Sequence, residues 1–437
     1  MRNTLLVVFI IISFFRCNKK TDNNNQNIIT SDINNFWNAY DKIIATKDSI
    51  LQYKYLDSLY IKKATLGLKG IIQARDYTSE DYITAINSYP KFWNSVRENT
   101  FKTVNYIDEL NDGIEKVRGI YPELKPAKIY FTIGALRSNG TTIDSLVLIG
   151  SELAMTDKNT ISSEFEGDLR VNRRFFFDSN PIDNLVLLNI HEYVHTQQKP
   201  AVNNLLSYTL REGIAEFVSV VAMGVPSAAP AINYGNKNKK VKQKFEEEMF
   251  YGNNRHHWLW SDYKNEFNTR DLGYYIGYKI AEINYNNADV KQNAIKEMIE
   301  LDYANEPQIE DFVNRTNFFS KSLEELYQDF DKSRPTILNI KQFKNNDISV
   351  NPNTKEITVQ FSEVLNGKNT SVDYSELGKD YFPKITDRFW EPGNKSWTMK
   401  VDLEPNKHYQ FFVSNNFRTE KGIPLKWYLI EFKTAKK

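Results

Sequence analysis

The feature that most constrains this chain is the stretch His191-Glu192-Tyr193-Val194-His195, which holds two of the chain's five histidines. In an α-helix, residues four apart lie one above the other, so both imidazoles point in the same direction. Two imidazoles on one helix face can bind one metal ion. Glu192 lies about 100° further round the helix, within reach of a water molecule at that ion. The stretch therefore predicts a helix that carries a candidate metal site.

The residues around this stretch favour such a helix. Asn180 and Pro181 are typical of an N-cap and of the first helical position, and Asp183 falls in the first turn. An apolar run then leads into the stretch as far as Ile190, and Pro200 ends the helical pattern. We expect a mostly buried helix. The alternative interpretation is an ordinary helix that carries two histidines by chance.

A second helical pattern covers residues 206–221, and Gly224 is typical of a helix end. Glu212 and Glu216 are four residues apart, so they share one face of this helix. Two carboxylates that face a core are very costly unless a cation meets them, and a metal ion with its histidines supplies that charge. We expect Gly213 to let the two helices approach closely. The alternative is a solvated helix face.

Together, the HEYVH stretch and the Glu-Gly-Ile-Ala-Glu stretch at residues 212–216 resemble the gluzincins, the zinc peptidases with a glutamate ligand on the helix after HExxH. The resemblance implies that Glu212 is the third ligand beside His191 and His195. It also implies that Glu216 hydrogen-bonds a ligand histidine and fixes its tautomer. Sixteen residues, 196–211, separate His195 from Glu212, a shorter gap than in many members. Glu216 therefore stays open as the ligand instead.

Aromatic residues further along the chain are candidates for stabilising an oxyanion, as in related zinc proteases. Tyr274 and Tyr278 are four apart on an expected helix, and His256 and His257 are the alternatives. Such tyrosines can equally be core packing. The stretch Asp-Leu-Gly-Tyr-Tyr-Ile-Gly-Tyr-Lys-Ile at 271–280, with the two motifs above, is similar to uncharacterised, inferred zinc-protease lipoproteins of Bacteroidota-type bacteria.

The region before the motif predicts helices and a small sheet. From Phe36 to Val117 the pattern is helical and rich in large aromatics, which indicates a helical subdomain. The apolar runs Lys128–Ile133 and Leu146–Gly150 predict strands. In gluzincins an edge strand binds the substrate backbone, so either run is a candidate for that role; the alternative is ordinary core sheet. We therefore expect residues 31–333 to form an α+β, zincin-like catalytic domain, mostly helical.

A second domain is expected at residues 334–437, where short runs alternate between apolar and polar residues. Period-two alternation bounded by Asn, Gly and Pro is typical of half-buried antiparallel strands. Three stretches, beginning at Ile357, Leu403 and Gly422, resemble bacterial Ig-like domains of secreted envelope proteins. The resemblance implies an all-β Ig-like sandwich that acts as a spacer or adhesive module. His408 is expected on a strand surface.

The N-terminus predicts export and a lipid anchor. Residues 5–15 are almost wholly apolar, too short to span a bilayer and typical of a signal-peptide core. Cys17, the chain's only cysteine, follows directly and is a candidate lipidation site. We expect a lipoprotein signal peptide at 1–17 and a flexible tether at 18–30, although Arg16 departs from the usual residues before such a cysteine. The alternative is a plain secretory signal with an incidental cysteine.

Taken together, these features predict a zinc-dependent metallopeptidase with one Zn²⁺, held in the cell envelope by its lipid anchor, either periplasmic or surface-exposed. Glu192 is the expected general base, and the substrate is a peptide or protein, with a preference for internal bonds. A formal net charge of +1 gives no reason to expect nucleic acid as a partner. One alternative is a surface lipoprotein that binds protein or glycan through its Ig-like domain, with a degenerate or structural zincin fold. Another is a zinc hydrolase that acts on a non-peptide bond.

Overall fold

The computed structural model describes residues 27–251, 254–261 and 265–436, in which helices are combined with small sheets. This composition agrees with the predicted α+β class. The predicted signal peptide 1–17 and Cys17 lie outside the described residues. The chain divides into two compact units. Unit 1 holds the described residues up to Ile107, with Pro126–Phe165 and Phe177–Ile182, and unit 2 holds Asp108–Lys125, Glu166–Phe176 and everything from Asp183 on.

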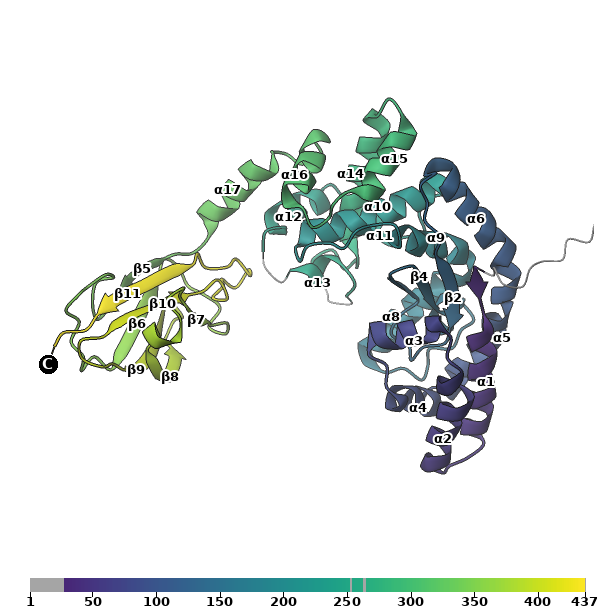
Figure 1. Cartoon of the computed structure of the whole chain (residues 1–437), viewed down its shortest axis with the longest axis horizontal. Coiled ribbons are helices and arrows are strands. Elements are labelled where there is room, and N and C mark those ends of the chain that lie inside the picture. Colours follow the sequence, from purple (N-terminus) through teal and green to yellow (C-terminus); the bar gives the residue numbers. More distant parts are fainter. Residues whose placement is uncertain (1–26, 252–253, 262–264, 437) are drawn as a thin grey trace, which may run out of the picture. The chain divides into compact units, whose positions relative to one another are not determined.

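The first helices of the chain, purple to blue in Figure 1, belong to unit 1, and buried aromatic side chains form their core. The ring of Phe36 lies 5.1 Å from that of Trp37 and 5.0 Å from that of Trp93. A capping box between Thr78 and Asp81 starts one of the helices by satisfying its first backbone N–H groups. The helices of this unit are α1 (Ser31–Ile44), α2 (Ser49–Leu59), α3 (Leu66–Arg75), α4 (Ser79–Ser88), α5 (Pro90–Phe101) and α7 (Ser151–Ala154).

Unit 1 also contains a four-stranded sheet in the order β1-β2-β4-β3, with β1 (Ile28–Ile29), β2 (Lys128–Thr132), β3 (Gly140–Ile143) and β4 (Leu146–Gly150). Both predicted strands are confirmed as β2 and β4, which pair in parallel. Each has a neighbour on both sides, so the prediction that one of them is the free edge was wrong; β1 and β3 are the edges. The tether predicted to run to residue 30 overlaps β1, where Ile28 is buried.

Most of the remaining helices belong to unit 2, where α10 packs against both α9 and α14. The helices are α6 (Ile107–Ile120), α8 (Gly167–Asp178), α9 (Leu185–His195), α10 (Leu205–Met223), α11 (Pro230–Lys237), α12 (Lys240–Glu248), α13 (Arg255–Trp258), α14 (Leu272–Asn287), α15 (Lys291–Glu300), α16 (Glu306–Arg315) and α17 (Leu323–Ser333). Helices α1 to α6 confirm the helical pattern predicted from Phe36 to Val117.

The buried motif helix is confirmed as α9, but its start differs from the prediction. A 3-10 turn, Pro181–Asn184, precedes α9, and Asn180 has the left-handed φ of 56°, so Asn180 is not its N-cap. The helix ends at His195, before Pro200. The second predicted helix is α10, which Gly224 ends in a left-handed conformation as expected.

Helix α10 approaches α14 more closely than side chains would allow. A Cβ placed on Gly213 would lie 2.2 Å from the backbone carbonyl carbon of Gly277, and one on Gly277 would lie 2.0 Å from the carbonyl oxygen of Thr209. The expectation that Gly213 serves the approach of α9 and α10 was therefore wrong. The glycine pair instead brings α14, with its tyrosines, against the helix that carries Glu212.

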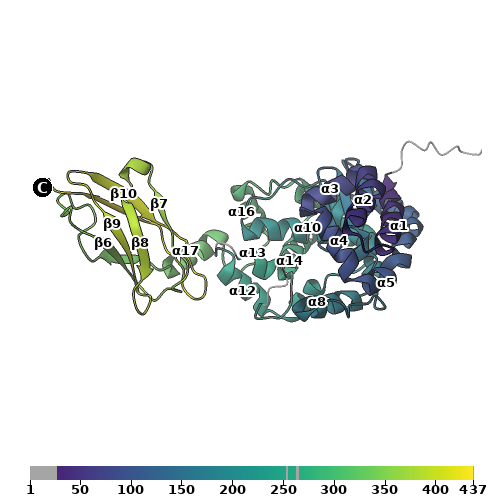
Figure 2. The same cartoon turned by 90° about the horizontal axis from the view of Figure 1, so that it is seen from below.

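The C-terminal region is all β and has two antiparallel sheets, β5-β6-β9-β8 and β11-β10-β7. Figure 2 shows β6, β9 and β8 running side by side in the first of them. Buried apolar side chains from both sheets share one core. The four predicted runs are confirmed as strands β6, β9, β10 and β11; burial alternates in β10, whereas in β6 and β9 Thr358 and Thr398 are buried like their apolar neighbours. The strands are β5 (Ile337–Ile340), β6 (Glu356–Phe361), β7 (Val372–Tyr374), β8 (Lys384–Trp390), β9 (Ser396–Asp402), β10 (His408–Val413) and β11 (Tyr428–Lys433).

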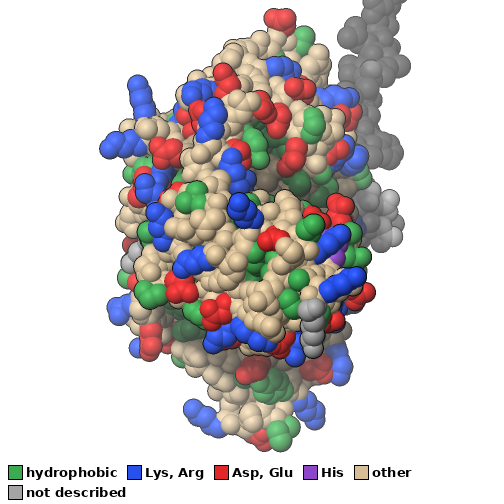
Figure 3. Space-filling model, turned by 90° about the vertical axis from the view of Figure 1, so that its left-hand side faces the viewer, with side chains coloured by type: hydrophobic (Ala, Val, Ile, Leu, Met, Phe, Trp, Pro, Cys, Tyr) green, Lys and Arg blue, Asp and Glu red, His purple; other side chains and the backbone are tan. Residues whose placement is uncertain are grey.

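The surface carries mixed charge. On the face drawn in Figure 3, lysine and arginine side chains are interspersed with acidic ones, in line with the formal net charge of +1. His408 is half-exposed on β10, as expected for a strand surface, and its Nε2 lies 2.8 Å from Glu431 Oε1. Within the described part of the chain, no helix combines the length and the apolar character needed to cross a membrane.

Candidate metal centre

The last turns of α9 place the predicted motif in the interior of unit 2. His191 is 5% exposed, Glu192 9% and His195 6%. The two imidazole rings lie 4.7 Å apart and nearly perpendicular, at 86°. Because they are four residues apart on one helix face, both rings reach toward α10, the helix that packs against α9.

Glu212 meets both histidines from α10. Its Oε2 lies 3.6 Å from His191 Nε2 and 3.2 Å from His195 Nε2. One ligand atom from each of these three residues lies within 4.8 Å of the other two. Donors of a tetrahedral site with metal–ligand bonds of about 2.1 Å are about 3.4 Å apart, so the two distances match a single shared ion. His191, His195 and Glu212 can therefore hold one metal ion.

Glu216, one turn after Glu212, contacts the Nδ1 side of His191 and is not one of the three residues that can hold the metal ion. Its Oε2 is 3.0 Å from His191 Nδ1, and Ser227 donates a hydrogen bond to its other oxygen. An ionised carboxylate can only accept, so Nδ1 donates to Glu216, and Nε2 is the ring nitrogen that lies toward Glu212. Of the two glutamates between which the sequence left a choice, Glu212 is the one that the geometry brings to both histidines.

A second acceptor, which sequence reasoning missed, holds the other histidine. Gln198 Oε1 lies 2.7 Å from His195 Nδ1. The amide nitrogen of Gln198 donates to the carbonyl oxygen of Arg211 at 3.1 Å and to the hydroxyl of Tyr303 at 2.9 Å. That hydroxyl in turn donates to the carbonyl oxygen of Met298 at 2.6 Å. These contacts turn the amide oxygen of Gln198 toward Nδ1, so Nε2 is the His195 nitrogen that lies toward Glu212.

Gln198 and Tyr303 differ in whether the sequence alone could have pointed to them. Gln198 stands three positions after His195, in the turn that follows α9, and a polar residue so close to the motif was an available signal. Tyr303 is 105 residues from Gln198, in the segment between α15 and α16, and no local pattern connects the two.

The electrostatics of the cluster favour a positive charge at its centre. Burial opposes a charged imidazole, but the hydrogen bonds to Glu212 and Glu216 outweigh it and raise the pKa of His191 to about 10. Burial also opposes the charge on Glu212, yet the charges and hydrogen bonds of His195 and His191 hold its pKa well below the usual range. The ionised carboxylates are thus met by positive charge on the imidazoles, a charge that a bound cation can supply instead.

Glu192 differs from the other two glutamates in its contacts. Its carboxylate is buried beside the cluster but makes no hydrogen bond or ion pair with any residue that the structure describes. A carboxylate that is not engaged elsewhere can accept a proton from water, the role that the sequence predicts for Glu192.

The two predicted tyrosines lie in different surroundings on α14. The Tyr274 hydroxyl donates to Glu212 Oε2 at 2.5 Å, and its ring stacks on His191 at 5.9 Å. Burial and the charge of Glu212 raise the pKa of Tyr274 well above its usual value, so it stays a donor. One turn later, Tyr278 packs edge-on against Phe217 at 5.3 Å, and burial raises its pKa to about 12. Only Tyr274 belongs to the cluster.

The two alternative histidines do not join the cluster either. His256 and His257 lie on the short helix α13, with ring centroids 4.3 Å apart. Neither belongs to the group of side chains that can hold a metal ion. Among the predicted candidates for oxyanion stabilisation, the geometry therefore favours Tyr274.

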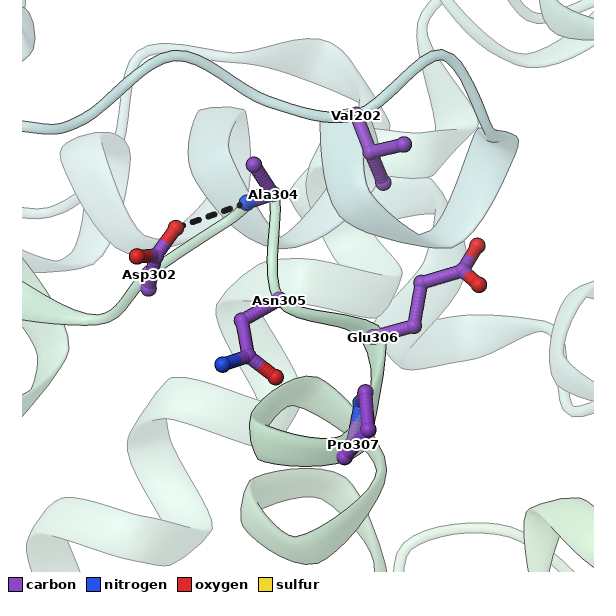
Figure 4. Close-up of a pocket in the computed structure, with 6 residues that line it drawn as sticks. All are labelled: Val202, Asp302, Ala304, Asn305, Glu306 and Pro307. Carbon is purple, nitrogen blue, oxygen red and sulfur yellow. Dashed lines mark hydrogen bonds between the residues drawn. The ribbon is translucent and has the colours of Figure 1, made fainter.

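An open pocket of about 510 Å³ lies elsewhere in unit 2 and contains none of the metal-centre residues (Figure 4). Its acidic groups are already engaged: Asp302 accepts from the Ala304 N–H at 3.1 Å and pairs with Lys199, and Glu306 accepts from the side chain of Asn204 at 2.8 Å. The pocket is lined by Val202, Asp302, Ala304, Asn305, Glu306 and Pro307. Both of its carboxylates thus already accept a hydrogen bond from the protein.

Comparison with known proteins gives little likeness. No family model matches the chain, and no curated protein does. Among solved structures, domains 1–6 of the surface layer protein SbsC align with 11% identity and a TM-score of 0.19, over 93% of this chain and 45% of that one. The N-terminal part of the S-layer protein SbsC aligns with 12% identity and a TM-score of 0.18, over 92% of this chain and 69% of that one. At such TM-scores the likeness assigns neither fold nor function.

Proposed function

We propose that the chain is a zinc-dependent metallopeptidase. The observation that supports it best is the convergence of His191 Nε2 and His195 Nε2 on Glu212 Oε2, at 3.6 and 3.2 Å, beside the uncommitted carboxylate of Glu192. Two imidazoles and one carboxylate are a donor set typical of catalytic zinc sites, which leave one position open. A purely structural site has no use for a base, so Glu192 favours an enzyme over the alternative of a binding protein.

The proposed roles follow from the positions of the side chains. His191, His195 and Glu212 hold Zn²⁺, which when bound supplies a Lewis acid that acidifies water and polarises a carbonyl group. Glu192 takes the proton of the attacking water and then delivers it to the departing amine. Glu216 and Gln198 each accept a hydrogen bond from the Nδ1–H of one histidine and so leave both Nε2 atoms to bind the ion.

Tyr274 is the proposed oxyanion donor. Its hydroxyl rests on Glu212 and keeps its proton, because burial and the neighbouring carboxylate raise its pKa well above 10. A donor held beside the ion can turn toward the oxygen that becomes negatively charged as water attacks the carbonyl. This assignment leaves Tyr278 with a packing role.

The finer features of the fold and the location are part of the same proposal. We assign the helical part with its small sheet to the zincin-like folds, on the resemblance of the HEYVH and Glu-Gly-Ile-Ala-Glu stretches to gluzincins. We assign the two antiparallel sheets that share one core to an Ig-like sandwich, as their sequence patterns suggest. The apolar run before Cys17 supports a lipid anchor to the cell envelope, on its periplasmic or exposed face.

The proposal is tested by metal analysis and a peptide-library cleavage assay on the purified full-length chain. We expect about one zinc per chain, cleavage that a chelator abolishes, and recovery when zinc is restored. Glu192→Gln should keep the metal and lose cleavage by roughly 100- to 10,000-fold, because only the base is removed. Glu247→Gln, at an exposed site on α12, is the matched control. Cleavage that survives complete metal removal, or a near-normal Glu192→Gln variant, would contradict the proposal.

A further inference from the structure

An exposed tryptophan stands next to the proposed oxyanion donor in a backbone conformation that tryptophan rarely adopts. Trp260 has a φ of 55° and is 46% exposed, and its indole N–H lies 3.4 Å from the Tyr274 hydroxyl. Its backbone N–H donates to Asp271 Oδ1 at 2.7 Å, and Asp271 is itself left-handed, with a φ of 60°. Bulky residues are held in this region only where surrounding contacts enforce it, and such positions cluster at functional sites.

The indole of Trp260 belongs to a cluster of two aromatic rings and one cationic side chain. The Trp260 ring meets the ring of Tyr208 at 5.3 Å, edge to face. The guanidinium of Arg255 lies 4.9 Å from the centre of the Tyr208 ring and 5.6 Å from that of Trp260. Arg255 is exposed, and none of the described carboxylates forms an ion pair with it. Its N–H groups thus remain available to a ligand, while the two aromatic rings hold its position.

The stack lies within reach of the reacting centre. Tyr208 and Glu212 are four residues apart on α10, so they share one face and are separated by about one helical turn of 5.4 Å. Arg255, in contact with Tyr208, is therefore on the order of 10 Å from Glu212. An extended peptide advances about 3.3 Å per residue, so this span corresponds to about three residues.

We propose that Arg255, supported by Tyr208 and Trp260, is a carboxylate-binding subsite for the substrate, and that preferred peptides carry a carboxylate within about three residues of the cleaved bond. The inference rests on the proposed peptidase function. A guanidinium binds a carboxylate through two parallel N–H donors, and the exposed indole beside it covers the apolar part of the same substrate segment. The carboxylate can belong to an Asp or Glu side chain or to a free C-terminus, since the chemistry is the same.

The test is a synthetic peptide library digested by the full-length chain, with cut sites identified by mass spectrometry. The wild-type chain should cut peptides with a nearby carboxylate in preference to others by roughly 10- to 100-fold, the range expected for hydrogen bonds to a charged group. Arg255→Met should abolish that preference and Trp260→Ala should weaken it. Arg388→Met, at an exposed position on β8, is the charge-matched control and should retain it. Zinc content checks that each variant keeps its metal centre.

The outcomes separate the subsite from the enzyme. A library with amidated C-termini distinguishes the two carboxylate sources, since a preference that persists there comes from Asp or Glu side chains and one that vanishes comes from the free terminus. If the wild-type chain cleaves in a chelator-sensitive way but shows no carboxylate preference, or if Arg255→Met retains it, the subsite is overturned and the peptidase stands. If no chelator-sensitive cleavage occurs, both proposals fall.

Discussion

The molecule has two buried regions of opposite chemistry. The core between the C-terminal sheets consists of apolar side chains such as Trp397 and Phe411, each of which stabilises the fold by leaving water. Where α9 meets α10, the chain instead buries two histidines with Glu192, Glu212 and Glu216. Buried charges cost several kcal/mol unless they are balanced, so this second region loses stability in a way that the first does not. The difference teaches that the first core stabilises the fold, whereas the second accepts a loss of stability that the proposed metal ion would offset.

The largest effect is expected from Phe411→Ala, which tests whether the stability of the apolar core and the metal affinity of the candidate centre are independent. Phe411 is fully buried on β10, and Phe411→Ala should destabilise the C-terminal region by about 3–5 kcal/mol through lost burial and a cavity. Zinc affinity should not change, because no ligand or ligand partner belongs to this core. The measurements are urea unfolding followed by fluorescence and a zinc competition titration.

Phe389→Ala is the control for this experiment, because Phe389 lies on β8 with 37% of its surface exposed and should cost less than Phe411→Ala. A fall in zinc affinity that accompanies Phe411→Ala would break the comparison, since it would show that the two regions are energetically coupled.

The next effect concerns the tyrosines of α14. Tyr274→Phe should lower kcat by roughly 100- to 1000-fold, the cost typical of losing one oxyanion donor. Tyr278→Phe is the matched control: the same atom is removed one turn away, where the ring packs against Phe217, and kcat should stay near that of the wild type. Steady-state kinetics on one peptide would measure both. An equal loss in the two variants would contradict the assignment of Tyr274 to the reacting centre.

What could be predicted from the sequence differs between the two regions for a physical reason. The strand at Ile357 and the helix at His191 were predictable because periodicity reports which face of an element is buried. Contacts between distant elements leave no such local trace. For this reason the close approach at Gly213 was assigned to the wrong neighbouring helix, and the partnership of Gln198 with Tyr303 was missed.

Positive φ angles could not be predicted from the sequence either. Nothing in the sequence around Trp260 indicates a φ of 55°, because tryptophan is among the residues least expected there, and the conformation depends on the Asp271 side chain eleven residues away. The short strand β1 was assigned to a tether for a related reason. Its two residues, Ile28 and Ile29, pair with residues of β2 that lie 101 positions later, so the local pattern does not show the partner.

A smaller effect is expected at Gln198, and it tests how the histidines are oriented where α9 meets α10. Gln198→Leu should weaken zinc binding by roughly 10- to 100-fold, the range typical of groups that orient a metal ligand. The reason is that His195 loses the acceptor that keeps the proton on Nδ1. A zinc competition titration measures the affinity, and ¹⁵N NMR of the histidine ring reports the tautomer without any metal.

The neighbouring Gln197 provides the control for Gln198→Leu. Its side chain bonds the backbone of Lys125 and contacts neither ligand histidine, so Gln197→Leu should leave zinc affinity unchanged. Gln198→Glu restores an acceptor for Nδ1 and should recover part of the affinity. If Gln198→Leu binds zinc as well as the wild type, the amide does not hold His195 for the metal.

The smallest expected effect lies one step further from the ion, at Tyr303. Tyr303→Phe removes the hydroxyl that accepts from Gln198 Nε2, but the Arg211 carbonyl still accepts from the same nitrogen and continues to fix the amide. One neutral hydrogen bond contributes about 0.5–1.5 kcal/mol, so zinc affinity should fall by roughly 2- to 10-fold, less than in Gln198→Leu. The same titration compares the variants. If Tyr303→Phe is as damaging as Gln198→Leu, the hydroxyl rather than the Arg211 carbonyl sets the amide, and the polar region depends on a contact 105 residues from Gln198.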